Sequence, residues 1–227
     1  MYFNWLKLLW QEFKVATPVA MWLLPLLTVG GLLLLLDTRT DESSRSEYVA
    51  LMVEVVFPLG IMYVANGLIL REREKNTLAF IATRSSLSIV WLRRLAALFI
   101  GVGLCLGILL LIYWQFYLHL HVGKMFLASL AVSLVLTSMS SVISLFTKEM
   151  NTGYLIGTLW WALSLMNPKV MLSLFSPYLY LFYFWFSAKE NLAPDLWLAN
   201  KLSLLGVATM LGLVCVQLLR STERFVT

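Results

Sequence analysis

A series of apolar stretches, each close to the length of a membrane-spanning helix, constrains this chain more than any other feature. A helix needs about 20 mostly apolar residues to cross roughly 30 Å of hydrocarbon. Six stretches meet or approach this length: residues 17–36, 48–70, 95–117, 125–146, 152–166 and 198–219. The chain is 60% hydrophobic and 13% charged, whereas soluble domains are about half apolar and about a quarter charged. These proportions exclude a soluble enzyme, a disordered tail or a disulfide scaffold, and they predict one all-α integral membrane domain over residues 1–227.

The region before the last apolar stretch leaves the number of spans open. Residues 152–166 are short for a span, and a second apolar stretch, residues 170–187, follows them and is interrupted by Pro177. Either the first stretch spans the membrane and the second dips back into the outer leaflet, or both of them span. The aromatic residues concentrated at 178–186 favour the first alternative, because Tyr and Trp prefer the headgroup level. We predict six transmembrane helices with a re-entrant outer segment at 170–187.

Most basic residues flank apolar stretches, so orientation in the bilayer explains the net charge of +5 and no nucleic-acid partner is predicted. With six spans and both termini in the cytoplasm, eleven basic residues lie inside and six outside, with Lys189 and Lys201 among the outer ones. A seventh span exchanges Arg220 and Arg224 for these two lysines. The count of basic residues therefore does not decide between the two topologies.

The first fifteen residues match neither a span nor a cleavable signal peptide. Asn4, Lys7, Gln11 and Lys14 recur at three- and four-residue spacing beside a face of apolar residues. This pattern predicts an amphipathic helix over residues 1–15 that lies in the cytoplasmic interface of the membrane, with its lysines at the headgroups.

The segment between the second and third predicted spans, residues 71–94, is longer than a chain reversal requires. It begins with alternating charges at 71–75 and continues with a short helical pattern that places Leu78 and Ile81 on one face. Most connections of this kind take about 2–8 residues, whereas this one takes more than twenty. The charges alone could simply end a span. The short amphipathic helix after them instead suits docking to a soluble partner.

The order of these features resembles the permease subunits of type-2 ABC exporters (the ABC-2 family). The resemblance rests on a charged block, Asn76-Thr77-Leu78, a short helix, a polar turn at 83–86 and a basic start to the third span. Asn76 stands where that family usually has glycine, and Ala79 where it usually has glutamate. The matching residues are Glu72, Glu74, Thr77, Leu78, Ile81 and Arg94. The resemblance extends to nearly the whole chain, including the interfacial helix, the short fifth span and the re-entrant segment.

This resemblance implies a division of labour between subunits. The chain contains no Gly-x-x-x-x-Gly-Lys phosphate loop, so the ATP and Mg of such a transporter belong to a separate cytosolic ABC ATPase. That subunit would dock on a cytoplasmic coupling helix at 76–82, and the six matching residues would couple it to the permease. A second permease copy, identical or different, would complete the pathway. The implied activity is outward movement of a hydrophobic or amphipathic cargo (a drug, an antimicrobial peptide or a lipid) across a bacterial plasma membrane.

Glu54 is the only acidic residue within a clear predicted span. A charge at the bilayer centre costs roughly 2.5–3.5 kcal/mol, so Glu54 should face protein, water or substrate. Two interpretations stay open: a packing residue, or a residue that lines the transport pathway. Asn66 in the same span and Trp160 in the fifth are the other pathway candidates.

Small residues at nearly four-residue spacing predict faces on which helices pack closely. The predicted fourth span carries five hydroxyl residues in this pattern: Ser129, Ser133, Thr137, Ser141 and Ser144. Helix packing is the favoured interpretation, and a polar track for substrate is the alternative. The pairs Gly103/Gly107 and Gly153/Gly157 have the same spacing, and either pair could help a dimer to form.

The sequence favours a transport subunit over an enzyme. His119 and His121 cannot share a helical face, and no third ligand lies near them, so no metal site is predicted. The spans carry no serine–histidine or paired-carboxylate arrangement. The alternative function is an integral membrane enzyme that acts on a lipid or peptide, followed by a regulatory or sensor protein.

Overall fold

A computed structural model of the chain describes residues 49, 51–74, 86–116, 121–166, 177–182 and 194–226. These residues contain five α-helices, one π-helical turn and one 3-10 turn, and no strand. In chain order they are η2 (Met52–Val56), α4 (Phe57–Glu74), α6 (Leu87–Phe116), α7 (Val122–Thr147), α8 (Met150–Met166), η3 (Pro177–Leu179) and α10 (Pro194–Val226). The all-α prediction is confirmed for this part of the chain.

Three of these helices are long and apolar enough to cross a membrane: Leu87–Ile112, Val122–Thr147 and Leu196–Ser221. Each contains 26 residues, which corresponds to about 39 Å at 1.5 Å per residue. A shorter apolar helix covers Met52–Leu68. The described chain is therefore compatible with a membrane-embedded protein. The predicted helix at 1–15, the span at 17–36, the coupling helix at 76–82 and most of the re-entrant segment lie outside the described residues, so the six-span count stays a prediction.

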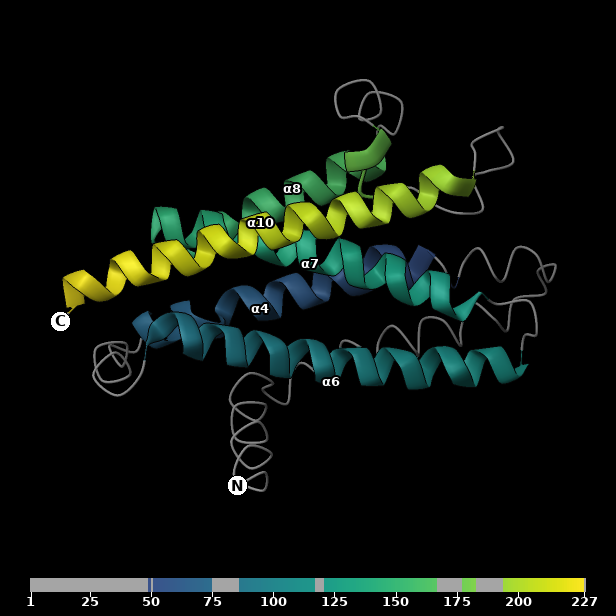
Figure 1. The fold of residues 1–227 in the computed structure, drawn as a ribbon, viewed down its shortest axis with the longest axis horizontal. Coiled ribbons are helices and arrows are strands. Elements are labelled where there is room, and N and C mark those ends of the chain that lie inside the picture. Colours follow the sequence, from purple (N-terminus) through teal and green to yellow (C-terminus); the bar gives the residue numbers. More distant parts are fainter. Residues whose placement is uncertain are drawn as a thin grey trace.

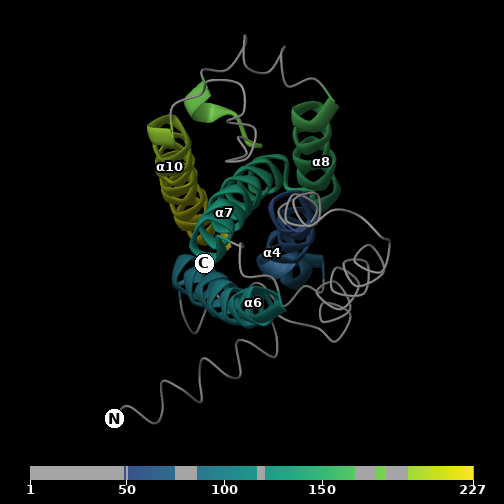
Figure 2. The same ribbon diagram turned by 90° about the vertical axis from the view of Figure 1, so that its right-hand side faces the viewer.

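The helices lie side by side and alternate in direction, with α4, α7 and α10 running one way and α6 and α8 the other (Figure 1). Helix α7 occupies the centre and contacts α4, α6, α8 and α10 (Figure 2). In α7, 67% of the most apolar 18-residue stretch is buried, compared with 24% of the corresponding stretch in α6 and 22% in α10. Helices α6 and α10 therefore present most of their apolar surface to the surroundings.

Small side chains explain why α7 can stand at the centre. The hydroxyl residues buried along it are Ser129, Ser133, Thr137, Ser138, Ser140, Ser141 and Ser144. Short side chains on several faces allow neighbouring helices to approach closely from more than one side. The structure confirms the packing interpretation of the spaced hydroxyl residues.

The two glycine pairs differ in what surrounds them. A methyl group on Gly153 would overlap Ser144 Oγ and the Ser140 carbonyl oxygen, and one on Gly157 would overlap the Met62 sulfur. This pair is a close-contact face of α8 against α7 and α4, as predicted. A methyl group on Gly107 would meet no atom within 4 Å.

Several helix bounds differ from those predicted. Helix α6 begins at Leu87 rather than at 95, because Leu87 and Trp91 pack into a cluster with Cys215 and Leu219 of α10. Helix α4 continues through the first four residues of the charged block to Glu74, since arginine and glutamate are good helix formers. Helix α10 extends beyond 198–219 at both ends.

The described part of the aromatic segment is a turn at 177–182 that contacts α10. Tyr178 is exposed, whereas Tyr180, Leu181 and Phe182 are buried in a cluster with side chains of α7 and α10. Burial inside the protein, rather than anchoring at the headgroups, therefore accounts for two of the aromatic residues in this segment.

Candidate functional site

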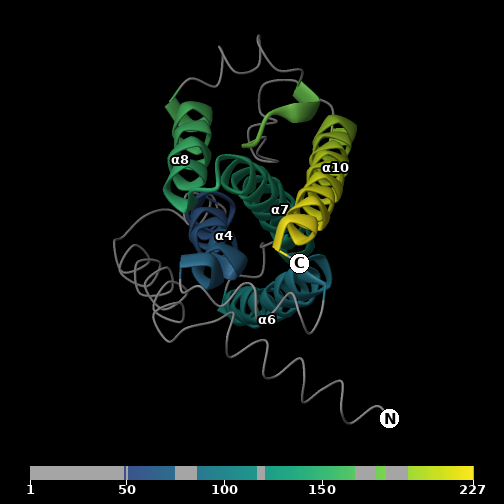
Figure 3. The ribbon, with the colours of Figure 1, turned by 90° about the vertical axis from the view of Figure 1, so that its left-hand side faces the viewer.

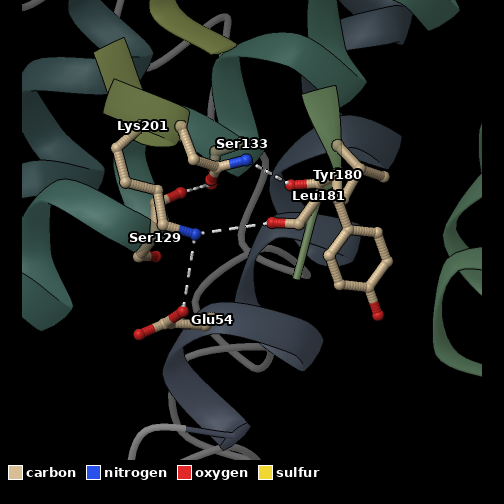
Figure 4. Close-up of polar contacts among 7 residues, drawn as sticks. Glu54, Ser129, Ser133, Tyr180, Leu181 and Lys201 are labelled. Atoms are coloured by element: carbon tan, nitrogen blue, oxygen red, sulfur yellow. Dashed lines mark hydrogen bonds and ion pairs between the residues drawn. The ribbon is translucent and has the colours of Figure 1, made fainter. Parts of the chain in front are cut away.

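A buried ion pair joins η2, the π-helical turn directly before α4, to α10. Glu54 Oε2, on η2, lies 3.8 Å from Lys201 Nζ, and neither side chain has any exposed surface. Figure 4 shows the Lys201 ammonium between the Glu54 carboxylate and the Leu181 carbonyl, with a dashed line to each. Lys201 is the sixth residue of the apolar helix Leu196–Ser221, which places it about 7.5 Å along that helix.

A π-helical turn positions Glu54. The Phe57 N–H donates to the Met52 carbonyl, five residues back, and Pro58 follows without an N–H of its own. Proline lacks the N–H that would donate to the carbonyl four residues back, so it disfavours regular α-helical geometry in the preceding turn. Single π turns often occur at functional sites. The indole Nε1 of Trp161, on α8, donates to the Val55 carbonyl at 2.8 Å. Helix α8 thus holds the backbone next to Glu54 in this geometry.

Hydrogen bonds join the turn at 177–182 to the same site. Lys201 Nζ donates to the Leu181 carbonyl at 3.5 Å, and Asn200 Nδ2 donates to the Tyr180 carbonyl at 2.9 Å. The Tyr180 hydroxyl donates to the Ser164 carbonyl of α8 at 2.9 Å. Elements η2, α8, α10 and the turn therefore meet at one buried polar cluster.

The contacts of the ion pair are long for buried charges. Hydrogen bonds from a cationic nitrogen to an oxygen are usually about 2.7–2.9 Å, and both Lys201 distances exceed this range. Within the described residues, neither Glu54 carboxylate oxygen accepts a hydrogen bond, and nor does Ser129 Oγ form one. Because removing two charges from water costs several kcal/mol per ion, this pair is weak as a stabilising contact.

A second polar feature lies on the face shared by α4 and α8. The Tyr63 hydroxyl and Thr158 Oγ1 are 2.8 Å apart, and the Tyr154 hydroxyl donates to the Tyr63 carbonyl at 2.7 Å. The two tyrosine rings pack against each other with centroids 4.7 Å apart and their planes tilted by 34°. Tyr63 is 39% exposed, although it lies within the apolar helix Met52–Leu68. An accessible row of hydroxyl groups on an apolar helix is more suited to contact with protein or water than with lipid.

The predicted coupling residues are described unequally. Arg94, on α6, is buried, and its Nη1 donates to the Leu68 carbonyl of α4 at 2.6 Å. Figure 3 looks onto the end of the bundle where α4 ends and α6 begins. Glu72 and Glu74 belong to the last turn of α4. Thr77, Leu78 and Ile81 lie outside the described residues.

The structure does not gather the three pathway candidates into one site. Asn66 is twelve residues beyond Glu54, or about 18 Å along a helix, and its Nδ2 donates to the Met150 carbonyl at 3.2 Å. Trp160 is half-buried and packs against the cluster around Met62 and Leu136. Their role in a pathway stays a prediction.

Sequence reasoning missed Lys201 as the partner of Glu54. Lys201 lies within the predicted span at 198–219, close enough to its start that the charge pattern alone places it at the outer surface as an orienting charge. The sequence did contain a signal for this pair. Glu54 and Lys201 are the one acid and the one base within the predicted spans, and burying either charge in a membrane costs free energy unless the two pair.

Comparison with protein-family models, with curated proteins and with solved structures found no match to this chain.

Proposed function

We propose that this chain is the membrane-spanning permease subunit of a type-2 ABC exporter, with six spans, both termini in the cytoplasm and the ATPase on a separate subunit. The observation that carries the proposal is the buried contact between Arg94 and the Leu68 carbonyl. It joins α4 to α6 at the base of the segment whose sequence resembles a coupling helix.

Transmission of movement from a docked subunit to the membrane helices requires a firm contact of this kind between α4 and α6. Movement of a short docking helix tilts two membrane helices together only if their ends are fixed to each other. A buried arginine that donates to a carbonyl is a strong, charge-assisted contact, and Arg94 forms it within two turns of the α4 end. The contact supports the proposal that Glu72, Glu74, Thr77, Leu78, Ile81 and Arg94 couple the permease to the ATPase.

The α4–α8 face suits the pathway side of such a permease. The hydroxyl row of Tyr63, Tyr154 and Thr158 lies beside the exposed apolar side chains Leu155 and Leu159. This mixture suits a hydrophobic or amphipathic cargo. In the proposed assembly the face is directed toward a second permease copy, and Asn66 and Trp160 belong to the same two helices.

Co-purification tests the proposal. Chain purified from its native membrane is expected to retain an ATP-hydrolysing subunit, and Leu78→Asp is expected to lose it. Lys148→Asp is the matched control, because Lys148 is exposed on the α7–α8 connection at the same end of the bundle. Aspartate is also among the residues that best tolerate the left-handed backbone found at Lys148. Turnover of a lipid or peptide by the chain with no ATPase attached would instead support the membrane-enzyme alternative.

A further inference from the structure

The buried polar cluster holds together elements that are far apart in the sequence. Glu54 reaches Lys201 from η2, and Lys201 reaches the Leu181 carbonyl of the turn at 177–182 (Figure 4). Lys201 is thus the point at which η2 and the turn are both attached to α10. We refer to Glu54, Lys201 and the Leu181 carbonyl as the ionic catch.

The catch is attached to a backbone that has an alternative geometry. A π turn contains one residue more than an α-helical turn of the same rise, so returning it to α geometry rotates the preceding residues by about 100°. Glu54 lies inside this turn, so the same change would turn its side chain relative to Lys201. In the observed π turn, the Trp161 indole donates to the Val55 carbonyl, and Pro58 disfavours the α geometry that would turn Glu54 away, so both favour the ion-paired arrangement.

The chemistry of the catch makes it easier to open than an apolar contact. Opening an apolar contact exposes surface that water solvates poorly, whereas opening a buried ion pair returns two charges to water. The hydration regained is large because both side chains are fully buried, and little bonding is lost, because Lys201 is held only at 3.8 and 3.5 Å and neither Glu54 oxygen accepts a hydrogen bond within the described chain. Replacing buried pairs by apolar residues is often neutral or stabilising.

We propose that the contacts of the ionic catch open and close reversibly in the folded protein. The catch holds η2 and the turn at 177–182 against α10, and its release admits water to this end of the helix bundle. The inference concerns the chain by itself and does not depend on the exporter function.

A cysteine at position 181 reports on release. Leu181 has no exposed surface, and its substitution leaves the backbone carbonyl that accepts from Lys201 in place. In a Cys105→Ala, Cys215→Ala background, the rate of reaction of Leu181→Cys with a charged, membrane-impermeant maleimide measures how often this site opens to water. Tyr178→Cys is the exposed control, and Leu136→Cys, buried in α7, reports global unfolding.

Two variants of the catch are expected to shift the rate in opposite directions. Glu54→Gln leaves the Lys201 ammonium buried without a counter-charge, and labelling at 181 should rise about tenfold or more, the factor that corresponds to 1.4 kcal/mol. The double variant Glu54→Leu with Lys201→Met replaces both charges by apolar side chains of similar size, and labelling should fall below that of the parent. Labelling at 178 and 136 should stay unchanged in both.

Equal labelling of position 181 in the parent and in folded Glu54→Gln would overturn the proposal. So would labelling of the apolar double variant as fast as that of Glu54→Gln, since the pair would then be an ordinary packing contact. If Glu54→Gln does not fold, the apolar double variant decides the question, because labelling slower than the parent supports a catch and faster labelling refutes it.

Discussion

At the scale of single residues, the charged side chains buried in this protein differ in how well they are satisfied. Arg94 Nη1 donates to a carbonyl at 2.6 Å, whereas Lys201 Nζ reaches its acceptors only at 3.5 and 3.8 Å. A short, charge-assisted hydrogen bond stabilises the fold, whereas a long buried pair contributes little to it. The first is suited to a permanent joint and the second to a contact that changes during function.

Replacement of Arg94 by leucine should therefore weaken the joint between α4 and α6. Loss of a hydrogen bond from a charged group costs about 1.5–3 kcal/mol, so a lower free energy of unfolding in detergent is expected. Arg220→Leu makes the same chemical change at an exposed position near the same end and should have almost no effect. An equal loss in both variants would mean that Arg94 does not form a specific joint.

The hydroxyl row between α4 and α8 allows a second test at this scale. Tyr63→Phe and Thr158→Val each remove one partner of a 2.8 Å hydrogen bond. A double-mutant cycle on the free energy of unfolding should show a coupling of about 0.6 kcal/mol, the average for such bonds between membrane helices. Thr209, which bonds to a carbonyl of its own helix, supplies the control, since Thr209→Val and Tyr63→Phe should be additive.

At the scale of elements, sequence patterns predicted helices better than helix ends. The spans predicted at 125–146 and 152–166 differ from α7 and α8 by at most three residues at any end. The start of α6 was misplaced by eight residues, because a basic pair at 93–94 looks like the end of a loop. Arg94 is instead buried within α6. No local sequence pattern predicts its hydrogen bond, because the acceptor is the carbonyl of Leu68, 26 positions earlier in the chain.

Glycine spacing alone also could not separate the two glycine pairs, although the structure separates them clearly. Gly153→Ala should cost about 1–3 kcal/mol through overpacking against α7, which exceeds the roughly 1 kcal/mol that alanine contributes by helix propensity. Gly107→Ala is the control, because a methyl group there meets nothing within 4 Å and only the propensity gain remains. Thermal unfolding should therefore shift down in the first variant and up or not at all in the second.

At the scale of the whole molecule, the two classes of buried charge lie at opposite ends of α4. Arg94 contacts Leu68 toward its C-terminal end, and Glu54 precedes its first turn (Figure 1). At the first end a contiguous motif allowed a prediction of coupling residues from the sequence, and their role stays a prediction. No contiguous motif marks the second end, where Glu54 and Lys201 are 147 positions apart (201 − 54) and only the packed fold brings them together.

The proposed coupling segment and the ionic catch, taken together, predict how export should fail when the catch cannot open. In the apolar double variant Glu54→Leu with Lys201→Met, the chain should fold and retain the proposed ATPase subunit, because the Arg94 joint lies at the other end. ATP hydrolysis should continue, whereas export should fall about tenfold or more if the catch becomes 1.4 kcal/mol harder to open. The Leu204→Met variant carries a volume-conserving change at a buried position about one turn beyond Lys201 on α10, and it should export normally. Undiminished export by the double variant would show that this end of the bundle does not open during transport. The coupling of α4 and α6 would then have to act on the pathway by another route.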